Sequence, residues 1–394
     1  MGKDAPKRSA VAAVPAALLG VTAVQAVAPR RNGPLALVGV TSPYLFAPLA
    51  GLVPVAIRRR DRRLMALLAA CAGAAGLMVR AEYVRSGGDP DHRVPITDSD
   101  ADASAAPDPA PELIPGPAPV VDIASWNALA SNSADRVVST VRELGADVVA
   151  IQELSTSQAA AVAVDPLIAD RYPARMLRPA LGLGLLSRLP ILDSGIRTSP
   201  GLRRGCPVLW ARVHLGAGRS LVTVVAHPMP ALMGLRGELS RLLGYETSPR
   251  DAEIAFVRDV VDEFVAAGDA VVLVGDFNVV DREPAGRELV AGLSDAHRAA
   301  GSGTGTSWAP VPLRRRGLTL LRLDRILTGP GVVARSLRTD RSWRGSDHCP
   351  VLASLAVPAA PPRSASASAS ARSVPGDGPA PGDGPAQDSA ASRP

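Results

Sequence analysis

The sequence predicts an α/β (α+β) fold in which two stacked mixed sheets are flanked by helices and preceded by three transmembrane helices. Three features predict it. Strand-like apolar runs alternate with amphipathic helical runs over residues 120–357, long apolar stretches come before them, and low-complexity segments lie on either side. We therefore expect a membrane region over 1–82, a Pro/Asp/Ala-rich linker over 83–119, a folded domain over 120–357 and a disordered tail over 358–394.

The first third of the chain predicts the three membrane spans. Apolar stretches run over 11–28, 35–57 and 64–79, and a spanning helix needs about 20 apolar residues. A signal peptide followed by buried helices is the competing interpretation, but the apolar character continues well past any plausible cleavage site. Prolines inside these stretches are costly in soluble helices and tolerated in membrane spans; they stand at Pro15, Pro43, Pro48 and Pro54.

Basic residues between the apolar stretches predict the orientation. Lys3, Lys7 and Arg8 precede the first stretch, and a dense arginine cluster at 58–63 separates the second from the third. Both segments lie on the same side of the membrane if there are three spans, and the positive-inside rule makes that side cytoplasmic. We therefore expect a multi-pass protein of the cell membrane, held there by its N-terminal helices, with everything after residue 80 outside the cytoplasm.

The overall charge and the cysteine content exclude few classes of function. The formal charge is +6 and the pI is about 9.8, which favours anionic partners only weakly, because much of the arginine lies beside apolar stretches. Cys71, Cys206 and Cys349 form neither a metal-ligand spacing nor a disulfide framework. Cys206 and Cys349 could pair outside the cytoplasm, although two free thiols are the favoured interpretation.

The elements of the folded domain follow from hydrophobic periodicity. A helix over 134–144 begins after the N-cap candidate Ser133 and stops at Gly145, and a second helix over 251–267 ends at Gly268. Apolar or alternating runs predict the strands; they are 120–126, 147–151, 181–186, 208–215, 221–226, 270–274, 320–327 and 349–357.

Five short blocks place polar side chains at the ends of strand-like runs. Carboxylates and amides supply the oxygen ligands that a hard divalent cation needs. In-line attack on phosphorus needs such a cation, a positioned water and positive charge near the phosphoryl oxygens. The blocks therefore predict hydrolysis of phosphate esters; they are Ser125-Trp126-Asn127, Ile151-Gln152-Glu153, Gly275-Asp276-Phe277-Asn278, Leu323-Asp324-Arg325-Ile326 and Ser346-Asp347-His348.

The ordered set of blocks resembles the endonuclease/exonuclease/phosphatase superfamily, whose members have the DNase I-like fold. The segments 184–190 and Thr306-Ser307-Trp308 match the same pattern, and the resemblance covers about residues 120–357. It implies a four-layer α/β/β/α sandwich and a metal-dependent phosphohydrolase with Mg²⁺ or Mn²⁺ as cofactor. A phosphodiesterase of the nuclease or lipid type is the favoured activity.

The resemblance also implies a role for each polar residue. Glu153 and Asn127 are expected to bind the metal, with Asp347 as an additional ligand. Asp276 orients or deprotonates the attacking water, while Asn278 and His227 hold the phosphate. Asp324 orients His348, which acts either as a base or as an electrostatic stabiliser. Each residue also has a structural alternative; these are a surface glutamate for Glu153, turn residues for Asn127, Asp276 and Asn278, and a strand-end histidine for His227.

The substrate is less well defined by the sequence. Arg314, Arg315 and Arg316 form a solvated loop or a grip for a nucleic-acid backbone, with Trp308 as the nearby aromatic contact and Arg322 and Arg325 close in sequence. Aromatic residues make up only 3% of the chain, which argues mildly against single-strand recognition.

Leucines over 228–249 have helical spacing, which predicts a helix packed on the domain or a membrane-contacting lid that suits a phospholipid headgroup. The expected substrates are thus nucleic acid, phospholipid headgroups or small phosphate esters, and no obligate protein partner is evident. A degenerate, non-catalytic binding module on the membrane is the alternative of a different class.

Overall fold

The computed structural model describes residues 5–42, 44–83, 118–202, 205–234 and 244–357. The tail over 358–394 and nearly all of the linker over 83–119 lie outside the described residues, so the predictions of disorder there stay untested.

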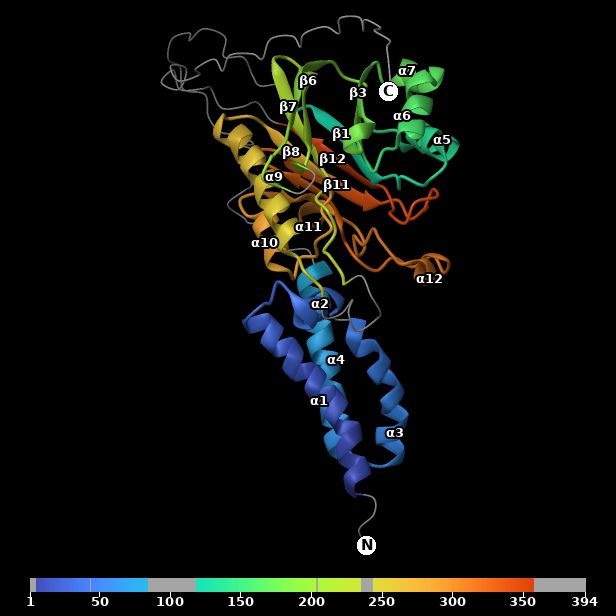
Figure 1. Ribbon diagram of the computed structural model, residues 1–394, viewed down its shortest axis with the longest axis vertical. Coiled ribbons are helices and arrows are strands. Elements are labelled where there is room, and N and C mark those ends of the chain that lie inside the picture. The colour runs from blue at the N-terminus through green and yellow to red at the C-terminus, as the bar shows by residue number, and fades with distance from the viewer. Residues whose placement is uncertain (1–4, 43, 84–117, 203–204, 235–243, 358–394) are drawn as a thin grey trace, which may run out of the picture. The chain divides into compact units, whose positions relative to one another are not determined.

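Two six-stranded mixed sheets form the centre of the domain (Figure 1). Within them β1 and β2 pair in parallel, as do β7 and β8, and the other pairs of neighbouring strands are antiparallel. The first sheet has the order β11 (Val333–Thr339), β12 (Val351–Ala356), β1 (Val120–Asn127), β2 (Val148–Gln152), β4 (Leu183–Ser187), β3 (Ala174–Arg178). The second has the order β5 (Ile191–Arg197), β6 (Val208–Gly216), β7 (Arg219–Ala226), β8 (Val271–Asp276), β10 (Asp324–Thr328), β9 (Ser294–Asp295).

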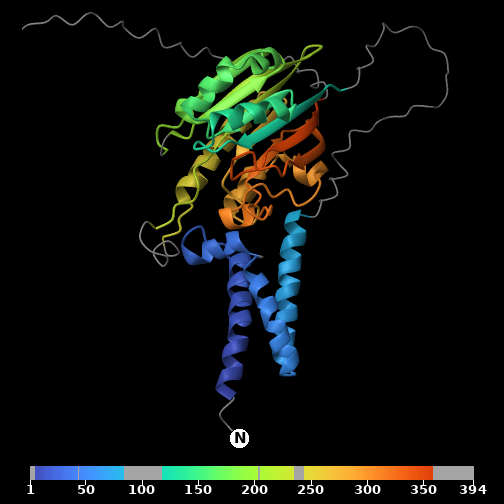
Figure 2. The same cartoon turned by 90° about the vertical axis from the view of Figure 1, so that its right-hand side faces the viewer.

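Helices cover the outer face of each sheet, which confirms the predicted sandwich (Figure 2). The first sheet packs against α5 (Ala134–Leu144), α6 (Thr156–Val164) and α7 (Pro166–Arg171) through Trp126, Val141 and Ile168. The second packs against α9 (Ser248–Ala266) and α10 (Pro284–Val290). A separate apolar cluster fills the space between the sheets, so three apolar layers hold four layers of structure together. The described part of the domain also contains the short helices α11 (Ala296–Ala300) and α12 (Val311–Arg314) and the 3₁₀ helix η3 (Pro179–Leu181).

The two predicted amphipathic helices are formed by the capping residues and apolar faces that predict them. Ser133 caps α5 by accepting a hydrogen bond from Arg136 N, and Gly145 ends the helix with φ 73°. Helix α9 buries Ile254, Val257 and Val261 on one face. It begins at Ser248, three residues earlier than predicted, because Pro249 stands in the first turn, where its missing N–H costs nothing.

Several elements were not predicted because their sequences lack a clean apolar period. Strands β5 and β11 lie at sheet edges and are largely exposed, so polar residues fill them. Strand β3, the short strand β9 and the small helices α6, α7, α10, α11 and α12 were missed as well. The strand predicted over 320–327 begins only at Asp324, since Leu321 pairs instead with Trp308. Asp324 therefore starts a strand rather than ending one.

Two further expectations concern the leucine-rich segment and the cysteines. Residues 235–243 of the segment lie outside the described residues. At its described ends, Leu232 and Glu246 exchange two backbone hydrogen bonds of 2.8 and 2.9 Å, so the helix predicted over 228–249 does not extend to them. All three cysteines are free and buried, which confirms the prediction of free thiols.

The N-terminal region is helical, but three separate spans are not supported. Among the described residues, one helix, Arg62–Arg80 within α4 (Arg62–Tyr83), is long and apolar enough to cross a membrane. The apolar part of α1 (Ala5–Val27) covers only Val11–Val27. The middle stretch is divided into α2 (Gly33–Thr41), the 3₁₀ helix η1 (Tyr44–Leu52) and α3 (Val53–Arg58), with a bend of 78° after α2. Its prolines, Pro48 inside η1 and Pro54 at the start of α3, replace one straight span by shorter pieces.

Close packing of two strands at Gly275 positions the polar end of β8. Gly275 pairs with Ala226 of β7, and a Cβ at this position would lie 1.9 Å from the Ala226 carbonyl oxygen. Because backbone cannot move aside cheaply, Gly275→Ala should destabilise the fold by about 3 kcal/mol. Thermal melting tests this, with Gly201→Ala as the control, since a Cβ there meets nothing within 4 Å. Equal melting temperatures for the two variants would contradict the close-approach argument.

Candidate active site

Strand direction brings the predicted polar residues to one edge of the two sheets. Asn127 ends β1 and Asp276 ends β8, while Glu153 and His227 follow β2 and β7. Parallel pairing places the ends of β1 and β2 side by side, and likewise those of β7 and β8. Strands β10 and β12 run antiparallel to β8 and β1, so Asp324 at the start of β10 and His348 just before β12 reach the same edge.

Asp276 lies at the centre of this cluster. Its Oδ2 accepts a hydrogen bond of 3.0 Å from Asn127 Nδ2 and lies 3.5 Å from Nε2 of both His227 and His348. Its Oδ1 accepts from the backbone N–H of Asn278 at 3.0 Å. Burial opposes the charge, but the two imidazoles and the Asn127 amide hold the pKa of the Asp276 carboxyl well below its usual range. Asp276 is therefore an ionised carboxylate with only 1% of its surface exposed.

His348 and Asp324 form a buried pair. His348 Nδ1 lies 2.7 Å from Asp324 Oδ2, while its Nε2 faces Asp276. Burial penalises the charged imidazole, yet the carboxylates of Asp324 and Asp276 raise the pKa of His348 to about 10. At neutral pH His348 therefore carries a positive charge, held between two carboxylates and directed at the site.

Asn127 and Glu153 form the opposite wall. Asn127 Nδ2 also donates to Glu153 Oε1 at 3.0 Å, and its Oδ1 accepts from Leu129 N. The amide thus bridges two carboxylates instead of turning its oxygen to them. Glu153 has φ 54° and Asn278 has φ 51°, a left-handed conformation that costs about 1–3 kcal/mol outside glycine and that is concentrated at functional sites.

Asn278 connects the site to the loop after β7. Its Nδ2 donates to the carbonyl oxygen of Pro228 at 3.0 Å and lies 3.3 Å from His227 Nε2. Burial lowers the pKa of His227, but the hydrogen bond and the charge of Asp276 outweigh it and raise the pKa overall. His227 and Asn278 thus place an imidazole and an amide side by side, the pair that the resemblance assigns to phosphate.

The predicted substrate-binding residues divide into two groups. Trp308 Nε1 donates to Asp347 Oδ2 at 3.1 Å, and Arg314 Nη1 donates to Ser346 O at 3.0 Å, so both lie against the loop that carries His348. Arg315 and Arg316 are exposed at the end of α12. Trp308 therefore orients Asp347, and whether any of these residues binds substrate stays a prediction.

Arg322 and Arg325 lie close in sequence to these arginines but are buried away from any cationic substrate grip. Both are 1% exposed and form ion pairs with two aspartates from other parts of the chain. Arg322 contacts Asp281 at 2.5 Å and Asp295 at 2.7 Å, and Arg325 contacts Asp281 at 2.5 Å. Arg325 Nη2 also donates to Val279 O at 2.9 Å, so this network fixes the loop after Asp276.

The buried network predicts a stability effect. Arg325→Met should destabilise the protein by about 3 kcal/mol, because Asp281 keeps its burial and loses a cationic partner. Arg315→Met is the matched control, and it should change the melting temperature little because the side chain is exposed. A variant pair with equal melting temperatures would show that Arg322 alone satisfies Asp281.

Two serines position the site and had no role in the sequence prediction. Ser346 Oγ donates to Asn127 O at 2.7 Å and accepts from His348 N at 3.0 Å, so it joins the end of β1 to the histidine loop. Ser307 Oγ accepts from the backbone N–H of Asp324 at 3.2 Å. Both are fully buried. Their places inside the blocks Ser346-Asp347-His348 and Thr306-Ser307-Trp308 were the available signal.

The donor set fits a divalent cation. Ligand atoms of Asp276, Asp324 and His348 all lie within 4.8 Å of one another, although the charged imidazole of His348 offers no lone pair to an ion, so the two carboxylates are the donors of this trio. Among the described residues, Asp324 Oδ1 is buried without a hydrogen-bond partner. The oxygens of Glu153 and Asp276 both converge on the Asn127 amide. These are the hard oxygen donors that such an ion prefers. The converging trio differs from the predicted ligands Glu153, Asn127 and Asp347, whose assignment stays a prediction.

A match to a family model agrees with this set of residues. A family model described as "Endonuclease/Exonuclease/phosphatase family" matches residues 124–348. Similar solved structures include an endonuclease/exonuclease/phosphatase from Bacteroides vulgatus, at 20% identity and a TM-score of 0.47, covering 60% of this chain and 99% of that one. A humanized D. rerio TDP2 has 20% identity and a TM-score of 0.47, with coverage of 60% and 98%. A protein of the same family from Beutenbergia cavernae has 18% identity and a TM-score of 0.46, with coverage of 62% and 73%. No curated protein matches the chain.

Proposed function

Because this chain belongs to the endonuclease/exonuclease/phosphatase family, a family of phosphoesterases, we propose that it is a divalent-metal-dependent phosphodiesterase. In this proposal an activated water attacks phosphorus in line with the leaving group. The observation that supports it most is the ionised carboxylate of Asp276, buried between the Nε2 atoms of His227 and His348 at 3.5 Å each.

The residues around Asp276 divide the chemistry among them. Asp276 accepts a hydrogen bond from the attacking water and orients it or takes up its proton; the ionised carboxylate, which the lowered pKa keeps present, is the form that either role needs. His348, held charged by Asp324 at 2.7 Å, stabilises the negative charge that develops on the phosphoryl oxygens. His227 and Asn278 bind the phosphate and fix its orientation.

The carboxylates supply a place for a metal ion. Glu153, with Asp347 and the Asn127 amide, would hold Mg²⁺ or Mn²⁺ beside Asp276. A bound divalent cation would polarise a phosphoryl oxygen and offset charge on the leaving group. Glu153 keeps about one third of its side chain exposed, so an ion and a substrate can reach it.

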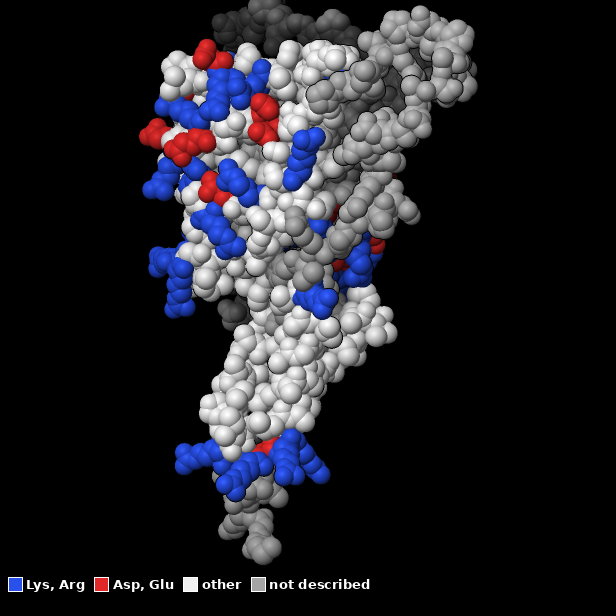
Figure 3. Space-filling view, turned by 180° about the vertical axis from the view of Figure 1, so that it is seen from behind, with Lys and Arg blue, Asp and Glu red and all other residues white. Residues whose placement is uncertain are grey.

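We place the enzyme at a membrane, with the catalytic domain on the outer face. The apolar helix α4 and the exposed apolar side chains of Val24, Ile57 and Leu77 support this placement. Figure 3 shows a basic belt at one end of an otherwise uncharged helical surface, which fits the exposed arginines of the 58–63 cluster. By the positive-inside rule that belt is cytoplasmic. Three spans remain part of this proposal only if α2 and η1–α3 act as one bent span and α1 as a short one.

The substrate is a nucleic-acid or phospholipid phosphodiester. Arg314 beside the histidine loop favours a polyanionic backbone, and the membrane placement favours a lipid headgroup. A non-catalytic binding module of the same fold is the alternative. Against it stands the set of polar residues gathered at one edge, including the left-handed Glu153, whose strain a passive module does not need.

Hydrolysis by the purified full chain in detergent tests the proposal. The assay offers Mg²⁺ with plasmid DNA, RNA, phospholipid vesicles and a bis-aryl phosphodiester, with and without EDTA. We expect cleavage of at least one substrate, loss of cleavage in EDTA and recovery on adding Mg²⁺ or Mn²⁺. Cleavage that survives EDTA would refute the metal requirement, and no cleavage of any phosphoester would favour the binding module.

A further inference from the structure

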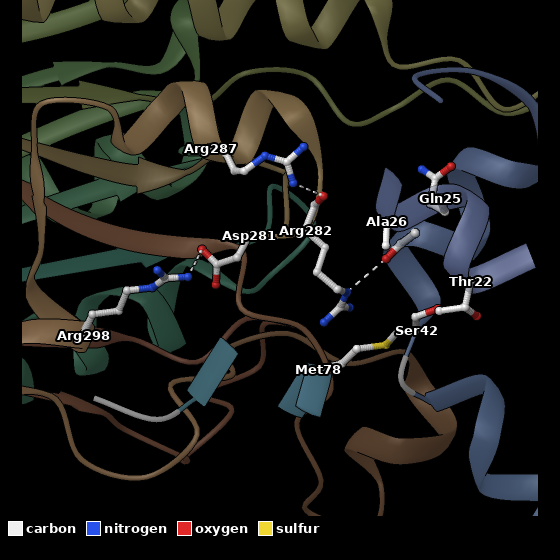
Figure 4. A pocket seen from close by; sticks show the side chains of 10 residues that line it. Thr22, Gln25, Ala26, Ser42, Met78, Asp281, Arg282, Arg287 and Arg298 are labelled. Atoms are coloured by element: carbon white, nitrogen blue, oxygen red, sulfur yellow. Dashed lines mark hydrogen bonds and ion pairs between the residues drawn. The ribbon is translucent and has the colours of Figure 1, made fainter. Parts of the chain in front are cut away.

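A cavity of about 300 Å³ lies between the N-terminal helices and the loop that follows β8 (Figure 4). The ends of α1 and α4 and residues of α2 form one wall, with Ala26 and Met78 among its apolar members. Arg282, Arg287 and Arg298 of the folded domain form the other wall. The catalytic residues Asp276 and His348 do not line it, so this cavity is separate from the site described above.

The charged wall carries an excess of positive charge. Asp281 is the acidic residue among those lining the cavity, and it is already engaged by Arg322 and Arg325 at 2.5 Å. Arg298 Nη2 lies 3.6 Å from Asp281 Oδ1, beyond close hydrogen-bond distance. Arg287 Nη1 donates to the Arg282 carbonyl, and its side chain is exposed. Arg287 and Arg298 thus keep donor capacity toward the cavity.

Arg282 reaches from the folded domain to the helices. Its Nε and Nη2 donate to the carbonyl oxygens of Gly39 and Val40 at 3.0 and 2.8 Å, and Figure 4 shows the side chain directed at this wall. Burial outweighs the attraction of Tyr44 and Glu283 and lowers the pKa of Arg282 to about 10. An anion in the cavity would stabilise the charged form of this side chain.

The apolar wall continues onto exposed helix surface. Val24 and Val27 near the end of α1 are 50% and 87% exposed, and Leu77 and Val79 near the end of α4 are 71% and 40% exposed. A ligand that fits both walls has an anionic head of phosphate size and an apolar chain. A free phosphate would use the arginines and leave the apolar surface uncovered.

We propose that this cavity binds the headgroup of an anionic phospholipid, with the acyl chains lying on the exposed ends of α1 and α4. Arg287 and Arg298 contact the phosphate, and the lipid holds the loop after β8 against the helices. The inference rests on the membrane placement given under the proposed function. Asn278 lies four residues before Arg282 on the same loop, so the bound lipid supports the segment that carries the catalytic amide.

Native mass spectrometry of the detergent-solubilised full chain tests this, with phosphatidylglycerol as the probe and EDTA present so that no hydrolysis occurs. Each lost charge-assisted hydrogen bond is worth about tenfold in affinity, so Arg287→Gln/Arg298→Gln should weaken binding about 100-fold. Arg287→Gln alone should weaken it about tenfold; it changes an exposed residue and guards against misfolding of the double variant. Arg175→Gln/Arg178→Gln in β3 removes the same charge elsewhere and should leave binding unchanged.

Three results would overturn the proposal. The cavity variants and the β3 variant could bind phosphatidylglycerol equally well, or the wild type could bind phosphatidylcholine as tightly as phosphatidylglycerol. Inorganic phosphate could also displace bound phosphatidylglycerol as effectively as added phosphatidylglycerol does. Asp276→Asn separates this inference from the catalytic one. It should retain lipid binding and lose hydrolysis. Hydrolysis without lipid binding would refute the cavity proposal alone, whereas lipid binding without hydrolysis in the wild type would refute the phosphodiesterase alone.

Discussion

Replacement of Asp276 by Asn is expected to lower kcat/KM for a phosphodiester by at least about 10³-fold with little change in the fold. The Asp276 side chain is 1% exposed, and its Oδ2 lies 3.5 Å from two imidazole nitrogens. An amide of the same shape still accepts a hydrogen bond from Asn127, but it carries no charge and takes no proton from water. Steady-state hydrolysis with saturating Mg²⁺ measures the loss, and thermal melting checks the fold.

The matched control for this variant is Asp193→Asn on the exposed edge strand β5. It removes the same charge from the same fold and should leave kcat/KM within about twofold, since surface substitutions away from the site have small effects. An Asp276→Asn enzyme that keeps activity within about tenfold of the wild type would show that this carboxylate does not activate the water. Another group at this edge of the sheets would then have to activate the water.

The central strands explain why the position of Asp276 could be predicted from the sequence. Strands β1, β2, β7 and β8 lie at the centres of their sheets and are buried on both faces. Such strands appear as continuous apolar runs, and polar residues that follow them stand out. Parallel pairing then brings those polar ends together, so local pattern and topology agree on Asn127, Glu153, His227 and Asp276.

The residues that escaped prediction depend on contacts between distant parts of the chain. Arg322 and Arg325 lie close in sequence to the exposed arginines that follow α12, yet they pair with Asp281 and Asp295, 27 to 44 positions earlier. Ser346 bonds to Asn127, 219 positions away. No local period encodes such a partner.

The second large effect concerns His348. Replacement by Gln is expected to lower kcat about 10²- to 10³-fold, because a neutral amide cannot match the charge that the imidazolium offers to the phosphoryl oxygens. The carboxylates raise the pKa of His348 to about 10, so the charged form is present below that value and is lost as the pH rises through it. Activity that needs this charge should therefore fall on the alkaline side.

Asp324→Asn decides between the two roles of His348. Loss of one carboxylate lowers the pKa of His348, so the pH at which activity falls should move down in this variant. If His348 were instead the base, its neutral form would be required. Activity would then rise with pH through the same titration, and Asp324→Asn would extend that activity to lower pH. The pH profile of kcat/KM in the wild type and in Asp324→Asn distinguishes a falling limb from a rising one.

The double variant His348→Gln/Asp324→Asn separates a positioning role for Asp324 from an independent one. Asp324 contacts the site through His348 Nδ1 at 2.7 Å, so once the imidazole is gone the carboxylate has nothing to orient. The double variant should then be no more than about threefold slower than His348→Gln alone, as residues that act as one unit are strongly non-additive. If the losses of the two single variants multiplied in the double variant, Asp324 would act independently of His348. Metal ligation would then be the better account of the Asp324 Oδ1, which is buried without a partner among the described residues and lies near the ligand atoms of Asp276 and His348, all within 4.8 Å of one another.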